Sequence, residues 1–177
     1  MLFYFSATGN TEHVAEEIKT NGESVVFIPD AIKKGTFDFD VMDRRIGILS
    51  PTYFWGLPSI VKDFLEKAHF NYKGKPYCFY VATCGTTPGS SGSIAKDLLK
   101  NKGLSLDVCF DIKMPDTWTV IFDLSNKKKV DRKLLKSDKE IQKIQCQLKK
   151  ANYRESHGFN HPKICCRSLS KGLRQQG

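Results

Sequence analysis

Short apolar runs alternate with amphipathic stretches along most of the chain. Five runs have the length and composition of β-strands: Leu2–Phe5, Ser24–Ile28, Ile46–Ser50, Tyr77–Thr83 and Leu104–Met114. The third and fourth runs are apolar almost without alternation, as expected for strands that are covered on both faces. The stretches between the runs repeat apolar residues at helical spacing. This alternation predicts an α/β fold with a doubly wound, five-stranded parallel sheet.

Helical spacing is clearest in four stretches, and their apolar residues are Val14, Ala15 and Ile18; Ile60, Val61, Phe64, Leu65 and Ala68; Ile94, Ala95, Leu98 and Leu99; and Leu134, Ile141, Ile144, Leu148 and Ala151. The segment Pro29–Asp43 is less regular, and we expect a short helix around Phe37–Met42. From about Ser156 onward the chain has no period. We therefore predict one domain over residues 1–155 and a basic, flexible tail over residues 156–177.

Length and composition place the chain in a broad class. Its 177 residues suit one domain. No stretch approaches the ~20 apolar residues that span a bilayer, and the first strand begins at once, without the features of a signal peptide. The six cysteines show neither a C-x-x-C pair nor metal-ligand spacing. We expect a cytoplasmic protein in a reducing compartment, with no membrane partner and no metal.

The net charge of +9 is unevenly distributed. Residues 1–125 contain 13 Lys and Arg against 15 Asp and Glu, whereas residues 126–177 contain 15 against 4. A basic segment can bind nucleic acid, an anionic membrane or an acidic protein, and it can also be a solvated helix face with a mobile tail. No recognition motif accompanies the charge, so nucleic acid is not an expected partner.

The most informative segment runs from Phe5 to Thr11 and reads F-S-A-T-G-N-T, between the first strand and the first helix. Its hydroxyls, its amide and its backbone N–H groups converge beside the partial positive charge of a helix N-terminus. The turn has no Lys, unlike the G-x-x-x-x-G-K-[ST] loop of nucleoside triphosphatases, and it lacks the G-x-G-x-x-G of dinucleotide sites. It suits one terminal phosphomonoester; the simpler alternative is a turn that only caps the helix.

This segment resembles the FMN-phosphate loop of the flavodoxin family, [ST]-x-T-G-x-T at the end of the first strand. The resemblance implies strand order 2-1-3-4-5, with the ligand at the carboxyl ends of strands 1 and 3. The loops after the third and fourth strands should then hold a flat aromatic ring.

Both loops have suitable residues. Pro51–Pro58 reads P-T-Y-F-W-G-L-P, in which Trp55 can stack on a ring and Gly56 can adopt a positive φ. The resemblance implies that the Trp55–Gly56 peptide turns its carbonyl toward N5 of the flavin. Alternatively, Phe54 and Trp55 only cover the domain edge. Tyr53 can also turn inward to the core. The loop from Thr83 to Gly92 contains three glycines, whose backbone can approach the polar edge of a ring, and Cys84 is there as a packing residue or a reactive thiol.

These loops, together with Met114-Pro115-Asp116, look like the flavodoxin half of bacterial flavodoxin–ferredoxin fusion proteins, over about residues 1–155. The cysteine runs of a ferredoxin half are absent, so we expect a stand-alone flavodoxin or a fragment of such a fusion. Asp116 and Trp118 are weaker candidates to border the ring. The resemblance implies FMN as cofactor, bound by Ser6, Ala7, Thr8, Gly9, Asn10, Thr11, Pro51, Thr52, Tyr53, Phe54, Trp55, Gly56, Thr83, Cys84, Gly85, Thr86 and Gly89.

The implied function is electron transfer by non-covalent FMN between redox partner proteins, which are ferredoxin-type or other acidic proteins. The alternative is an NAD(P)H- or quinone-dependent FMN reductase on the same fold. No nucleophile–base pair stands out, so no catalytic residue is assigned.

Overall fold

The computed structural model of the chain describes residues 1–42, 44–116 and 125–156. Its main sheet has five strands in the order β2 (Val25–Phe27), β1 (Leu2–Tyr4), β4 (Arg45–Pro51), β6 (Tyr77–Cys84) and β7 (Leu106–Lys113). Every neighbouring pair is parallel. These are the five predicted strands in the predicted order, so the expected doubly wound α/β fold is confirmed.

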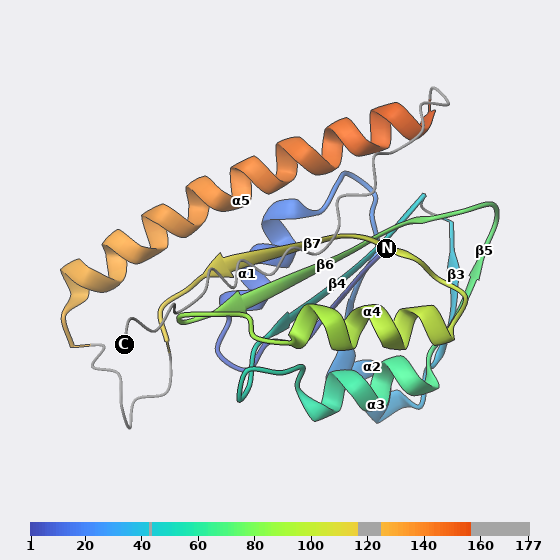
Figure 1. The fold of residues 1–177 in the computed structure, drawn as a ribbon, viewed down its shortest axis with the longest axis horizontal. Coiled ribbons are helices and arrows are strands. Elements are labelled where there is room, and N and C mark those ends of the chain that lie inside the picture. The colour runs from blue at the N-terminus through green and yellow to red at the C-terminus, as the bar shows by residue number, and fades with distance from the viewer. Residues whose placement is uncertain (43, 117–124, 157–177) are drawn as a thin grey trace, which may run out of the picture.

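Helices cover both faces of this sheet (Figure 1). On one face lie α1 (Asn10–Ile18) and α5 (Lys127–Ser156), and on the other lie α2 (Ile28–Lys34), α3 (Ser59–Lys67) and α4 (Ser91–Asn101). Each face has its own apolar core, with Leu2 in one and Phe3 in the other. The central strands β4 and β6 are buried almost throughout, which explains why their sequences barely alternate.

A second, two-stranded parallel sheet joins β3 (Asp38–Val41) to β5 (His69–Tyr72). The prediction of a helix around Phe37–Met42 is therefore wrong. The helix of this region is α2, which lies earlier in the chain. In β3 exposed and buried residues alternate, which is strand periodicity. The buried Phe39 ring packs edge-on against Phe3, with 4.8 Å between centroids.

The C-terminal helix α5 extends to Ser156, so this residue belongs to the helix and not to the predicted tail. The rest of that tail, residues 157–177, lies outside the described residues. No helix in the described part of the chain combines the length and the apolar character that crossing a membrane requires.

A buried ion pair joins the segment between α1 and β2 to the start of β4. Glu23 and Arg45 have side chains that are 1% and 3% exposed. Arg45 Nε donates to Glu23 Oε1 at 2.8 Å, and Arg45 Nη2 donates to Glu23 Oε2 and to the Ile18 carbonyl. Burial alone would raise the pKa of Glu23, but the hydrogen bonds from Arg45 and from the Thr20 N–H outweigh it and lower this pKa.

We predict that Glu23→Gln lowers the free energy of unfolding by about 3 kcal/mol at pH 7, because it leaves the Arg45 charge buried without its partner. The stabilisation from a carboxylate with a lowered pKa is present above the ordinary value of 4.5 and is lost as the pH falls through the folded value. Urea unfolding at pH 7 and below pH 4 measures both effects.

The control is Glu16→Gln, which removes the exposed pair with Lys19 on α1. An exposed pair contributes little, so a change within about 0.5 kcal/mol is expected at either pH. Equal losses in the two variants would contradict the role assigned to the buried pair.

Candidate functional site

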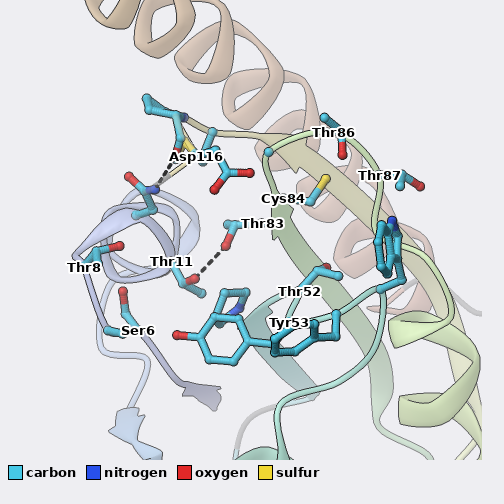
Figure 2. Close-up of a pocket in the computed structure, with 18 residues that line it drawn as sticks. Ser6, Thr8, Thr11, Thr52, Tyr53, Thr83, Cys84, Thr86, Thr87 and Asp116 are labelled. Atoms are coloured by element: carbon cyan, nitrogen blue, oxygen red, sulfur yellow. Dashed lines mark hydrogen bonds between the residues drawn. The ribbon is translucent and has the colours of Figure 1, made fainter. Parts of the chain in front are cut away.

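A cavity of about 650 Å³ opens where β1, β4, β6 and β7 end (Figure 2). Its size is that of a small-molecule site. All of the predicted site residues line it except Gly9, Gly56 and Gly89. Thr87, Met114, Pro115 and Asp116 line it in addition. Trp118, the other residue considered for this edge, lies outside the described residues.

The loop from β1 to α1 presents an open helix N-terminus to the cavity. The residue before α1 is Gly9, with φ 86°, and α1 has no side-chain cap. Its first N–H groups are therefore left to a ligand or to solvent, because an α-helix cannot satisfy them internally. Neither Asn10 nor Thr11 therefore caps α1 with its side chain.

Asn10 and Thr11 instead fix the position of this loop. Asn10 Nδ2 donates to the Pro115 carbonyl at 3.1 Å, and the buried Thr11 hydroxyl shares a 2.7 Å hydrogen bond with the Thr83 hydroxyl. The second bond is drawn in Figure 2. These contacts tie the loop to the ends of β6 and β7, so Ser6 and Thr8 are the better candidates for side-chain contact with a phosphate.

The loop after β4 makes a tight turn from Tyr53 to Gly56. Tyr53 N–H donates to the Gly56 carbonyl at 3.1 Å, and Gly56 N–H donates to the Tyr53 carbonyl at 2.9 Å. The central residues, Phe54 and Trp55, have φ of 47° and 57°. Such a turn normally carries Asn and Gly, and bulky residues there cost about 1–3 kcal/mol each. The expectation that Gly56 supplies the positive φ is wrong, because the two central positions of the turn do so.

The Gly89–Ser90 segment holds this turn in place. The Trp55 carbonyl accepts hydrogen bonds from Ser90 N–H at 2.8 Å and from Ser90 Oγ at 3.1 Å. Gly89 has φ 55°, and a Cβ there would lie 2.2 Å from the Trp55 oxygen. The Trp55 carbonyl is therefore directed at the start of α4, unlike the orientation that the resemblance implied.

The aromatic side chains of the turn remain accessible. Phe54 is 88% exposed and Trp55 65%, which is unusual for side chains of this size. Tyr53 does not turn into the core: it is 43% exposed and meets Phe5 edge-on, with centroids 6.1 Å apart. A flat ligand in the cavity would cover part of this aromatic surface.

The loop after β6 contributes a neutral thiol and a close backbone approach. Burial raises the pKa of Cys84 to about 11, with a further rise from the Asp111 charge. A thiol with this pKa is not a nucleophile at neutral pH, which favours the packing role. At Gly85 a Cβ would lie 2.0 Å from Asp116 Oδ2, so any larger residue would displace this carboxylate.

Two polar groups beneath the loops were not found from the sequence. Ser50 Oγ and Tyr80 OH share a 2.8 Å hydrogen bond in the core, where burial raises the pKa of Tyr80 to about 12. This bond joins β4 to β6 directly below the two loops. Both residues lie within strand-like runs and carry no local sign of their pairing.

The comparisons with known proteins identify the family. Residues 1–148 match the model of the flavodoxin domain family, so the chain belongs to this family of flavin-binding redox proteins. The further resemblance to the flavodoxin half of fusion proteins stays a prediction. No curated protein sequence matches the chain.

Among similar solved structures is the metal-soaked flavodiiron core of Flv1 from Synechocystis sp. PCC6803. It is 18% identical, with a TM-score of 0.46, and the match covers 64% of this chain and 30% of that chain. This chain thus matches less than a third of the length of that protein.

The residues present fit a flavin. Thr52 Oγ1, on the cavity lining, is buried without a hydrogen-bond partner among the described residues, and a bound ligand can supply one. The open N-terminus of α1 suits a phosphate, and the turn at Tyr53–Gly56 offers aromatic surface to a ring. No Lys or Arg is among the described residues that line the cavity, so neutral donors would hold the anion.

We predict that Gly89→Ala weakens flavin binding at least tenfold, because its methyl group would displace the Trp55 carbonyl and release the turn. Titration of the apoprotein with flavin, followed by fluorescence quenching, measures this. Gly74→Ala is the matched control, since Gly74 also has a positive φ (75°) but nothing within 4 Å of a Cβ. It should leave flavin affinity unchanged; equal effects of the two substitutions would show that the Gly89 contact is irrelevant to binding.

Proposed function

We propose that the chain binds FMN non-covalently in this cavity and carries electrons between redox partner proteins in the cytoplasm. One observation carries the proposal: the uncapped N-terminus of α1, which has no cation beside it among the described residues that line the cavity, and the exposed aromatic turn after β4 lie at the same edge of the sheet. The first matches a single phosphate and the second a flat ring. The described cysteines are all free, which fits a reducing compartment.

Each loop then has a distinct task. The N–H groups at the start of α1 and the hydroxyls of Ser6 and Thr8 bind the phosphate, while Asn10 and Thr11 hold the loop in position. Tyr53 and Trp55 flank the ring and limit its contact with water. FMN itself supplies the electron-transfer chemistry, and the protein supplies orientation and electrostatics.

The cavity favours a carrier over a reductase that takes NAD(P)H. The phosphates of a nicotinamide nucleotide are usually met by cationic side chains, yet Asp116 is the only charged group among the described lining residues. The exposed Phe54 and Trp55 also occupy the mouth that a second substrate would have to cross.

The exposed face of α5 is the docking surface that fits an acidic partner. Lys128, Arg132, Lys139 and Lys143 lie along this face with Leu135, which is 63% exposed, and opposite the buried stripe of the helix. The first turn of α5 contains three lysines and no acidic residue, although a helix N-terminus disfavours cations. Such a face can attract an acidic protein at long range and then make an apolar contact at Leu135.

We predict that FMN binds at least 100-fold more tightly than riboflavin. Thr8→Ala should weaken the binding of FMN about tenfold or more, since a hydrogen bond to a charged group contributes roughly 1.5–3 kcal/mol. Riboflavin affinity should not change. Thr36→Ala removes the same hydroxyl type from an exposed position outside the cavity and serves as control. Equal affinity of the native protein for FMN and riboflavin would refute the phosphate site.

We also predict that electron transfer from the reduced FMN protein to an acidic ferredoxin slows steeply between 50 and 500 mM salt, because exposed charges are screened within about 10 Å at 0.1 M.

Lys128→Ala with Lys139→Ala should slow the reaction at low salt and leave FMN affinity unchanged. Lys33→Ala with Lys34→Ala, on α2 at the opposite face of the sheet, should do neither. Stopped-flow absorbance gives the rates. A flat salt profile excludes α5 as the docking surface, and rapid reduction by NADPH alone would favour the reductase.

A further inference from the structure

Helix α5 reaches the ring-binding loop through one side chain. The half-buried Lys133 donates from Nζ to the Gly85 carbonyl at 3.1 Å. The fully buried Ser137, one turn later, donates from Oγ to the Lys113 carbonyl at the end of β7, at 2.7 Å, and to the Lys133 carbonyl at 2.9 Å. These bonds fix this part of α5 against the strand edge, so the Lys133 ammonium has a defined place beside the loop.

This contact determines how the Gly85–Thr86 peptide is oriented. The described peptide bonds include no cis form, so the Thr86 N–H points opposite to the Gly85 carbonyl. Lys133, which holds that carbonyl, does not line the cavity, whereas Gly85 and Thr86 do. The Thr86 N–H, on the opposite side of this peptide from Lys133, makes no hydrogen bond to the backbone of the described residues.

The other side of the loop is closed by Asp116. Its carboxylate packs so tightly on Gly85 that a Cβ there would be 2.0 Å from Oδ2. The peptide is therefore held between a cation on its carbonyl oxygen and a carboxylate on its Cα. Lys133 also places a positive charge beside this peptide.

A flavin ring gains negative charge on reduction, mainly at its pyrimidine edge, where N–H donors and a nearby cation stabilise it. We propose that Lys133 is a positioning residue for this cavity. It orients the Gly85–Thr86 peptide so that the Thr86 N–H faces the ring, and its charge makes the site bind reduced flavin more tightly than it otherwise would. This inference rests on the proposed FMN function, and it adds that the docking helix also sets the reduction potential.

The experiment compares the dissociation constants of oxidised FMN and of dithionite-reduced FMN under anaerobic conditions. Lys133→Met should weaken the binding of reduced FMN about tenfold more than the binding of oxidised FMN, because a charge-assisted hydrogen bond is about twice as strong as a neutral one. That ratio equals a fall of about 30 mV in the two-electron potential. Lys133→Arg, which keeps donor and charge, should stay within about threefold of the native ratio.

Lys136→Met is the control, because it removes the same charge from an exposed position one turn away. Equal shifts for Lys133→Met and Lys136→Met, or no shift for Lys133→Met, would overturn the inference. The Thr86 amide shift in ¹⁵N NMR spectra of the apoprotein gives a second readout: it should move in Lys133→Met and not in Lys136→Met, and an unmoved signal would likewise overturn the inference. Failure of the native protein to bind FMN would instead refute the proposed function.

Discussion

The candidate site depends on the parallel pairing of β4 with β1 on one side and β6 on the other. This pairing brings the carboxyl ends of the central strands to one edge, at the place where the strand order reverses and crevices form. The ladder continues into the loops through three hydrogen bonds: Phe5 N–H to the Leu49 carbonyl, Thr52 N–H to the Thr83 carbonyl and Met114 N–H to the Cys84 carbonyl. Each loop therefore leaves the sheet from a fixed position.

Stability and strain are separated along the strands. The buried Glu23–Arg45 pair stabilises the edge where β4 begins, whereas the positive φ values of Phe54 and Trp55 occur just beyond the edge where β4 ends. A strained turn persists only where its surroundings hold it, and here Ser90 does so through the Trp55 carbonyl. Release of that carbonyl would break its two hydrogen bonds with Ser90. These bonds therefore oppose a rearrangement of the turn when a bound flavin changes its charge.

The sequence predicted the five strands and most residues of the cavity, because strand periodicity and the F-S-A-T-G-N-T loop are local patterns. The prediction failed where two local patterns conflict, or where no local pattern marks the contact. The alternation of Phe37, Phe39 and Val41 was too short to outweigh an expected helix, although it marks a strand. The contacts of Ser90 with Trp55 and of Lys133 with Gly85 join residues 35 and 48 positions apart, and such contacts follow only from packing.

The central claim is that one cavity at this sheet edge binds one FMN. Its most direct test is the stoichiometry and identity of the flavin, measured by absorbance of the purified protein and by mass spectrometry of the ligand released on denaturation, after reconstitution with a mixture of riboflavin, FMN and FAD. The account predicts one FMN per chain with little of the other two. A colourless protein, or equal retention of the three flavins, would contradict it.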